Sequence, residues 1–147
     1  MAAPLLLDRL HLAGARFAEA NLAAAQLDGT DLTGAWLFGT ILVGTQLNGA
    51  DLTGANLRLA QLHKARLNIA HLDGADLTHA WLEEADLTDA DLEGADMSTA
   101  FKLTADQVVA ARPDSTTRLP DALAADPAVT ARITQVQAHN QASRRRS

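Results

Sequence analysis

Large apolar residues recur at every fifth position along most of the chain. The series runs without a break from Leu12 to Met97. Its eighteen members are Leu12, Phe17, Leu22, Leu27, Leu32, Leu37, Leu42, Leu47, Leu52, Leu57, Leu62, Leu67, Leu72, Leu77, Leu82, Leu87, Leu92 and Met97. The residue three positions after each of these centres is small. It is Ala at fifteen of the eighteen positions from 15 to 100 and Thr at the other three. Because a period of five matches neither a helix nor a strand, we expect the chain to turn once per repeat.

The glycines indicate where each turn lies. All nine stand two residues after an apolar centre. A type II turn needs a positive φ at its third residue, which Gly adopts without steric cost. Six consecutive repeats carry Gly from Gly29 to Gly54, so we expect type II turns there. Later repeats carry larger residues, including the β-branched Ile69, and we expect turns without positive φ near residues 59–70.

The repeated unit is well represented by Ala50-Asp51-Leu52-Thr53-Gly54. Its register over residues 10–100 resembles that of the pentapeptide-repeat family. The resemblance implies an all-β fold, a right-handed quadrilateral β-helix with four repeats per coil. The central Leu and the small residue before it would then point inward. The segment 11–100 would form about four and a half coils of this β-solenoid.

The two ends of the chain depart from the repeat. Residues 1–10, which contain Leu5, Leu6, Leu7 and Leu10, are interpreted either as an N-terminal cap or as a partial first coil. Residues 101–139 are predicted to form a small α-helical C-terminal cap. The stretch from Leu103 to Pro120 also resembles a tail that follows many bacterial pentapeptide repeats, which implies a bacterial source.

Local signals place two helices in the cap. Thr104 and Gln107 form a capping box before a short helix that ends by Pro113. Asp126 followed by Pro127 starts a second helix. An apolar stripe on that helix consists of Val129, Ile133 and Val136. The basic residues 140–147 are predicted to be a disordered tail.

Composition excludes several classes of function. The chain has no Cys, which rules out disulfides, thiol catalysis and thiolate metal sites. No apolar run approaches the ~20 residues of a membrane span, and the start lacks the basic region of a signal peptide. We therefore expect a cytoplasmic protein with no membrane partner. The net charge of −6 argues against direct nucleic-acid binding.

The repeat offers little for catalysis. A rod filled with Leu is expected to have no pocket, and the glycines are explained by turns, so we predict no enzyme activity and no cofactor. Residues twenty apart should stack on one face, which places His71 between Asp51 and Asp91. Such a ladder is either a metal site or a solvated surface. Stacked side chains on a flat face seldom converge, so we predict no metal.

Acidic residues are concentrated in the repeat. Residues 10–100 carry thirteen acids and four bases, whereas residues 101–147 carry four acids and seven bases. The candidate acidic face contains Asp31, Asp51, Asp73, Asp91 and Glu93. Its simplest role is to keep a Leu-rich rod soluble. The family resemblance implies an alternative, because some members are DNA mimics that bind a type II topoisomerase, as gyrase inhibitors or quinolone-resistance factors.

One coil carries a concentration of outward apolar residues. Trp36 and Phe38 flank an inward Leu, and so do Ile41 and Val43 on the next face. An apolar patch with a polar rim is typical of an interaction surface. The alternatives are that terminal segments cover the patch or that its apolarity is incidental. The sequence thus predicts a non-enzymatic scaffold or protein–protein interaction module, with an unidentified protein partner or a second copy as its ligand.

Overall fold

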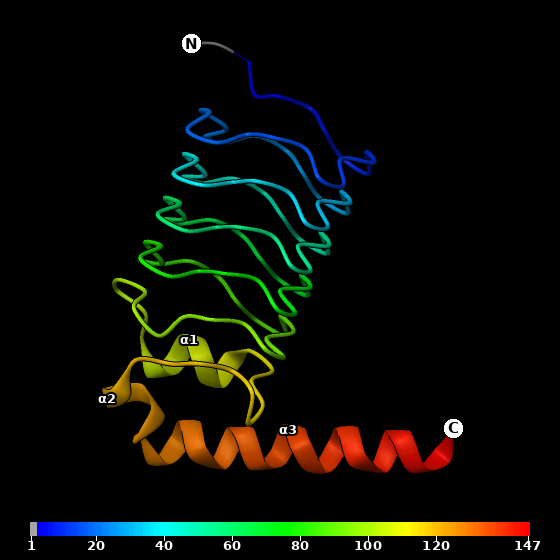
Figure 1. The fold of residues 1–147 in the computed structure, drawn as a ribbon, viewed down its shortest axis with the longest axis vertical. Helices are drawn as coiled ribbons and strands as arrows, with labels where there is room; N and C mark the ends of the chain where they lie inside the picture. Colours follow the sequence, from blue (N-terminus) through cyan, green and yellow to red (C-terminus); the bar gives the residue numbers. More distant parts are fainter. Residues whose placement is uncertain (1–2) are drawn as a thin grey trace.

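The computed structural model describes residues 3–147, so the first two residues of the 1–10 segment lie outside it. From Leu5 to Phe101 the chain winds into a rod of stacked coils (Figure 1). Parallel bridges join residues that are twenty apart, from Leu6 and Gln26 at one end to Trp81 and Phe101 at the other. Each coil therefore contains four five-residue repeats, and equivalent repeats of successive coils lie one above another.

The rod has four sides, which we name by their bridge residues. Side A contains His11, Asp31, Asp51, His71 and Asp91; side B contains Arg16, Trp36, Asn56, Asp76 and Asp96; side C contains Asn21, Ile41, Gln61, Trp81 and Phe101; side D contains Leu6, Gln26, Gln46, Arg66 and Asp86. The sides follow one another in this order around each coil. Side A is therefore opposite side C, and side B is opposite side D.

The lumen of the rod is filled by the apolar centres. From Leu27 to Met97 each centre is almost completely inaccessible to solvent. The small residue of each repeat is buried beside it, including three Thr residues. The hydroxyls of Thr30, Thr40 and Thr45 donate hydrogen bonds of 2.7–2.8 Å to carbonyls of the preceding coil. These bonds satisfy a buried polar group that would otherwise be costly.

Backbone pairing within the rod is limited to one bridge residue per repeat. Each side contains five residues, and four of them belong to a turn closed by a bond such as Ala55 N–H to the Leu52 carbonyl, 3.0 Å. Among residues 3–147, no run of paired residues is long enough to form a strand. The solenoid is thus built from bridges and turns rather than from the short strands that the fold class suggests.

The prediction that positive φ disappears near residues 59–70 is wrong. Leu59, Lys64 and Ile69 have φ of 59°, 57° and 54°. The Ile69 N–H donates to the Thr88 carbonyl of the next coil at 2.9 Å, as the Gly54 N–H does to Asp73 at 2.8 Å. The stacking register therefore imposes one turn geometry on the repeats from Leu7 to Leu92, whichever residue is present, whereas Thr99 in the last repeat has no positive φ.

The first described residues already follow the register of the rod. The Gln26 N–H donates to the Leu5 carbonyl, and the Leu7 N–H donates to the Gln26 carbonyl, both at 2.8 Å. The Leu10 N–H closes a turn onto the Leu7 carbonyl at 3.4 Å. Residues 5–10 thus form a repeat of a first coil.

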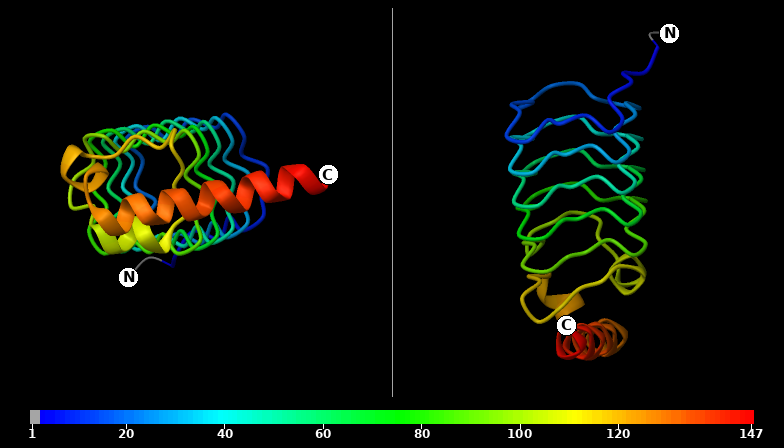
Figure 2. Two further views of the ribbon diagram at one scale, coloured as in Figure 1. Left: turned by 90° about the horizontal axis from the view of Figure 1, so that it is seen from below. Right: turned by 90° about the vertical axis from the view of Figure 1, so that its right-hand side faces the viewer.

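Three helices cover the opposite end of the rod (Figures 1 and 2). They are α1 (Ala105–Ala110), α2 (Asp121–Ala124) and α3 (Pro127–Arg146). Both bonds of the Thr104–Gln107 capping box are present before α1, and the Asp126 carboxylate caps α3. Between helices, the carbonyls of Arg112 and Arg118 accept bonds from the last coil. The last coil is therefore paired with chain that is no longer repetitive.

Helix α3 differs from the sequence prediction at its end. Residues 140–147 were expected to be disordered, but α3 continues through Arg146. No Gly or Pro interrupts the chain after Pro127, and the bases in the last turn interact favourably with the helix dipole. Val129 and Val136 of the predicted stripe are buried, and Ile133 is half-buried. None of the helices in the described part of the chain combines the length and apolarity needed to cross a membrane.

Candidate interaction surfaces

The structure gathers the predicted acidic residues on side A. Asp31, Asp51 and Asp91 are bridge residues of that side, and Asp73 and Glu93 follow the buried centres of the same side. Other groups interrupt the column: the imidazole of His71 lies between Asp51 and Asp91, and the guanidinium of Arg112 in the C-terminal segment pairs with Asp91. Side A is therefore a mixed ladder whose C-terminal end is partly neutralised.

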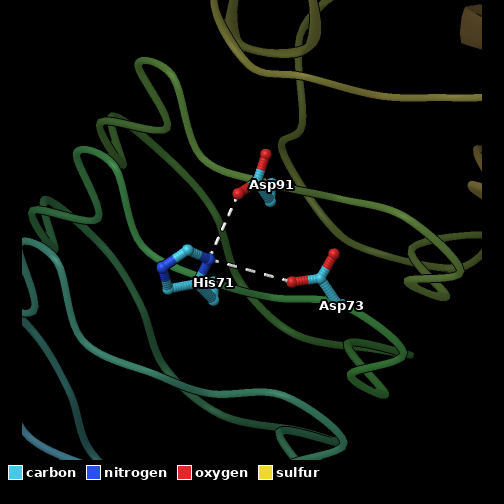
Figure 3. Close-up of side chains that lie close together, drawn as sticks. All are labelled: His71, Asp73 and Asp91. Atoms are coloured by element: carbon cyan, nitrogen blue, oxygen red, sulfur yellow. Dashed lines mark hydrogen bonds and ion pairs between the residues drawn. The ribbon is translucent and has the colours of Figure 1, made fainter. Parts of the chain in front are cut away.

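Three side chains of this ladder converge, contrary to the expectation for stacked residues (Figure 3). The Nδ1 atom of His71 lies 3.1 Å from Asp91 Oδ2 and 4.0 Å from Asp73 Oδ2. A histidine with two carboxylates is a donor set that suits a divalent cation, and the three ligand atoms lie within 4.8 Å of one another. However, Arg112 Nη1 already lies 3.1 Å from Asp91 Oδ1, so a positive charge is present beside the cluster.

The carboxylates of side A have unequal surroundings. Hydrogen bonds from Thr33 hold the pKa of Asp31 below its usual value, and those from Thr53 do the same for Asp51. Burial raises the pKa of Asp73, and the neighbouring Asp91 charge raises it further. Asp31 and Asp51 are thus negatively charged at neutral pH. A charge on Asp73 is less favourable, because this carboxyl is partly buried and lies near Asp91.

A cavity of about 650 Å³ separates the end of side A from α3, although the sequence predicted no pocket. Its lining residues are Ile69, His71, Asp89, Asp91, Arg112, Arg132, Gln135, Val136 and His139. Helix α3 crosses the end of the rod (Figure 2), and its residues from Arg132 to His139 form one wall of the cavity. Its lining offers none of the hydroxyl, thiol or amine nucleophiles on which covalent catalysis usually depends.

The predicted apolar patch lies on sides B and C. Trp36 is 47% exposed, and Phe38, Ile41 and Val43 are half-buried. Helices α1–α3 lie at the far end of the rod and leave Trp36 open to solvent (Figure 1). The patch is therefore a real but modest apolar surface.

Further along the rod, beyond Gln61, side C carries two more exposed aromatic residues that the sequence interpretation missed. On side C, Trp81 and Phe101 are 36% and 40% exposed, and their ring centroids lie 4.7 Å apart. The ring of His63 stacks on Trp81 at 5.7 Å. Trp81 and Phe101 stand 40 and 60 residues after Ile41 and therefore in its column. The twenty-residue spacing that groups the acids would have found them.

We call the combined set the aromatic surface: Trp36, Phe38, Ile41, Val43, Trp81 and Phe101. It covers parts of sides B and C, and side C is opposite the ladder of side A. The rings of Trp81 and Phe101 on side C therefore face away from the acidic column of side A, whereas Trp36 and Phe38 lie on side B between the two.

Solved structures similar to this chain are pentapeptide repeat proteins. One, from the thylakoid lumen of Arabidopsis thaliana, is 31% identical, with 71% of this chain and 69% of that chain covered and a TM-score of 0.57. Another, Rfr23 from the cyanobacterium Cyanothece 51142, is 37% identical, with 65% and 61% covered and a TM-score of 0.57. The chain thus spans about three fifths of the cyanobacterial protein.

The fluoroquinolone resistance protein QnrB1 is also similar, at 17% identity and a TM-score of 0.26, with 80% of this chain and 84% of that chain covered. A likeness this weak does not bear on function. A search of curated proteins gives no match. A sequence model of pentapeptide repeats matches residues 7–37, 37–68 and 70–100, with 8 copies. These matches cover nearly the whole rod, and the chain belongs to the pentapeptide repeat family.

Proposed function

We propose that this protein is a non-enzymatic solenoid that binds a protein partner through its aromatic surface. One observation carries the proposal. The chain has five Phe and Trp residues and no Tyr, and four of the five lie on the adjacent sides B and C. They are Trp36, Phe38, Trp81 and Phe101. In a chain this poor in aromatics, such a concentration on one surface is typical of an interface.

The scaffold suits this role. A rod of nearly five coils, from Leu5 to Phe101, holds most of its outward side chains on backbone that is bonded to both neighbouring coils. Little conformational entropy is then lost when a partner binds. The rings of Trp81 and Phe101 are already packed against each other, 4.7 Å between centroids, and so are preorganised. Trp is also the residue most often found at interface hot spots.

Several features disfavour catalysis. The lumen is filled by Leu and Ala, and the cavity beside α3 is lined by His and Asp but by no Ser, Thr, Tyr, Cys or Lys. Membership of a family of structural repeats supports the same view. We therefore assign binding rather than chemistry to the surfaces of the rod.

The alternative function, a DNA mimic that binds a type II topoisomerase, rests on the five acids of side A. A mimic needs a continuous run of negative charge. Here His71 and Arg112 interrupt the column, and Arg144 of α3 lies 3.7 Å from Glu93. The His71 imidazole and the two guanidinium groups break the run of carboxylates and weaken the alternative at the C-terminal end of the rod.

The experiment compares binding by matched surface variants. The double variant Trp36→Gln with Phe38→Ser removes the centre of the patch, and Asp31→Asn with Asp51→Asn is its control on the adjacent side A. Each tagged protein is used to capture partners from lysate of the native host, and the captured partner is then purified and titrated. We expect the wild type and the acidic variant to bind alike and the aromatic variant to bind at least tenfold more weakly. Undiminished binding by the aromatic variant would contradict the proposal.

A further inference from the structure

The His71 imidazole is the centre of a three-residue cluster on side A, beside the C-terminal helices. Its Nδ1 atom lies 3.1 Å from Asp91 Oδ2 of the next coil and 4.0 Å from Asp73 Oδ2 of its own repeat. Asp51 of the preceding coil turns to its own repeat instead, because its Oδ1 accepts from the Thr53 N–H at 3.0 Å. One ring nitrogen and two carboxylate oxygens therefore converge (Figure 3).

The spacing of these three atoms is close to that of a zinc site. Zinc binds imidazole nitrogen and carboxylate oxygen at about 2.0–2.2 Å, so two ligand atoms of a tetrahedral site lie about 3.3–3.6 Å apart. The distance from His71 Nδ1 to Asp91 Oδ2 is within a few tenths of an ångström of this spacing, and the Asp73 oxygen needs to approach by only about 0.5 Å. The Asp73 side chain is 35% exposed, so it can rotate by that amount without disturbing the core.

Arg112 orients one of the carboxylates and does not block it. Its Nη1 lies 3.1 Å from Asp91 Oδ1, which leaves Asp91 Oδ2 directed at His71. Arg112 is itself fixed, because its N–H donates to the Ala90 carbonyl at 2.9 Å and its Nη2 donates to Asn140 Oδ1 on α3 at 3.4 Å. In metal sites, hydrogen bonds of this kind to the second oxygen hold a ligating carboxylate in place.

The charges around the cluster complement a divalent cation. A second cavity, of about 290 Å³, lies beside it, and its charged lining residues are Asp73, Asp91, Glu93, Asp114, Arg112 and Arg144. The larger cavity beside α3 adds Asp89 and Arg132, whose charges cancel. With neutral histidines, the charged groups that line the two cavities therefore sum to minus two. Burial and the Asp91 charge raise the pKa of Asp73, so an added positive charge would be favourable at this carboxyl.

We propose that His71, Asp73 and Asp91 bind one zinc ion, with water completing its coordination. Zinc is favoured over magnesium and calcium, because those ions take oxygen ligands whereas imidazole suits zinc. Binding uses the lone pair of His71 Nδ1, so the proton of the neutral ring resides on Nε2, and half of this side chain is exposed to solvent. The ion joins two successive coils of side A beside α3, and the site is separate from the aromatic surface.

The test is isothermal titration calorimetry of the full, untagged chain with zinc chloride. We expect one zinc ion per chain. His71→Ala and Asp91→Asn should each weaken binding roughly tenfold or more, since each removes one ligand. Asp31→Asn is the matched control, because it makes the same change of charge on the same side at a distance of three coils from Asp91, and it should bind zinc as the wild type does.

NMR of the imidazole nitrogens shows where the ion binds, and circular dichroism confirms that each variant is folded. We expect zinc to shift the His71 Nδ1 resonance and to leave His139, the other imidazole of the larger cavity, unchanged. A wild type without saturable zinc binding overturns the proposal. So does an affinity that His71→Ala leaves unchanged, a shift at His139 in place of His71, or an equal loss in Asp31→Asn and Asp91→Asn. None of these results alters the proposed partner binding, which is measured separately.

Discussion

At the scale of single residues, the hydrogen bonds between stacked coils determine the backbone conformation of the turns, whatever the side chain. Gly54 and Ile69 occupy equivalent turn positions with φ of 65° and 54°. The preference of Ile for negative φ, on which a sequence-based prediction rests, is overcome by the bond from the Ile69 N–H to the next coil and by the bond from the Ala70 N–H that closes the turn. This is why the sequence could locate the turns but could not predict their conformation after residue 54.

The cost of that conformation can be measured at Gly54. A Cβ at this position would meet nothing within 4 Å, so Gly54→Ala adds conformational strain without a clash. We expect the free energy of unfolding to fall by about 1–2 kcal/mol in urea titrations. Ile69→Gly should raise it by up to about 1 kcal/mol, because the strain is relieved at an exposed site. Equal stabilities for the wild type and both variants would show that φ at these positions is not strained.

Outward carboxylates interact with the residue two positions later. The Thr88 hydroxyl donates to Asp86 Oδ1 at 2.6 Å and the Thr88 N–H donates to it at 3.1 Å. These bonds hold the pKa of Asp86 below its ordinary value of about 3.9. Their contribution to stability is present above that ordinary pKa and is lost as the pH falls through the lower, folded-state pKa.

Thr88→Val removes the hydroxyl bond and keeps the shape of the side chain. We expect the pKa of Asp86 to rise toward its ordinary value, because one of the two bonds to the carboxylate is gone. Carboxyl carbon chemical shifts, followed by NMR between about pH 2 and pH 6 on either side of that value, measure the change. An unchanged pKa in the variant would mean that the hydroxyl bond does not form in solution.

At the scale of elements, the C-terminal cap is attached to the rod by specific bonds. The Gln107 side chain on α1 donates to the Leu82 and Ala85 carbonyls at 2.7 and 2.9 Å. Gln107→Ala should lower the free energy of unfolding by about 1–3 kcal/mol, since it also breaks the capping box. Thermal unfolding measures the effect. Gln141→Ala on the exposed part of α3 is the control and should change stability by less than ~0.5 kcal/mol; a similar loss in both variants would argue against the cap.

How well each element could be predicted depended on whether its signals are local. Thr104 and the Asp126-Pro127 pair mark helix starts by their own side chains, and both starts are found there. Helix α2, with four residues and no side-chain cap, has no comparable signal and was not predicted. The end of α3 was not predicted, because a basic and polar sequence is compatible with a disordered tail as well as with a helix.

The candidate sites, too, could be predicted only where the sequence spacing itself determines which residues lie together. The column of side A follows from the twenty-residue spacing, and the sequence grouped its acids correctly as a column. The convergence of His71 and Asp73 on Asp91 depends on side-chain direction, which spacing does not give. The cavity beside α3 depends on how a helix docks against the rod, and no pattern in the repeat encodes that.

At the scale of the whole molecule, the distribution of charge separates the two functions considered. A DNA mimic would inhibit or protect gyrase supercoiling at micromolar protein, and raised salt would weaken the effect. Because Arg112 and Arg144 pair with acids at the C-terminal end of side A, we expect no effect on supercoiling. The wild type and a variant with Asp31→Asn, Asp51→Asn, Asp91→Asn and Glu93→Gln should then behave alike in the assay. Inhibition by the wild type that the variant loses would instead favour the mimic.

The central claim is that a period of five places one Leu per repeat inside a solid rod and the next residue outside it. Leu57 is fully buried and Arg58, its neighbour in sequence, is exposed. The most direct test compares Leu57→Ala with Arg58→Ala by equilibrium unfolding in urea. We predict a loss of about 2–5 kcal/mol for Leu57→Ala and a change within ~0.5 kcal/mol for Arg58→Ala. Equal losses at the two positions would contradict the inward register and, with it, the assignment of every outward surface.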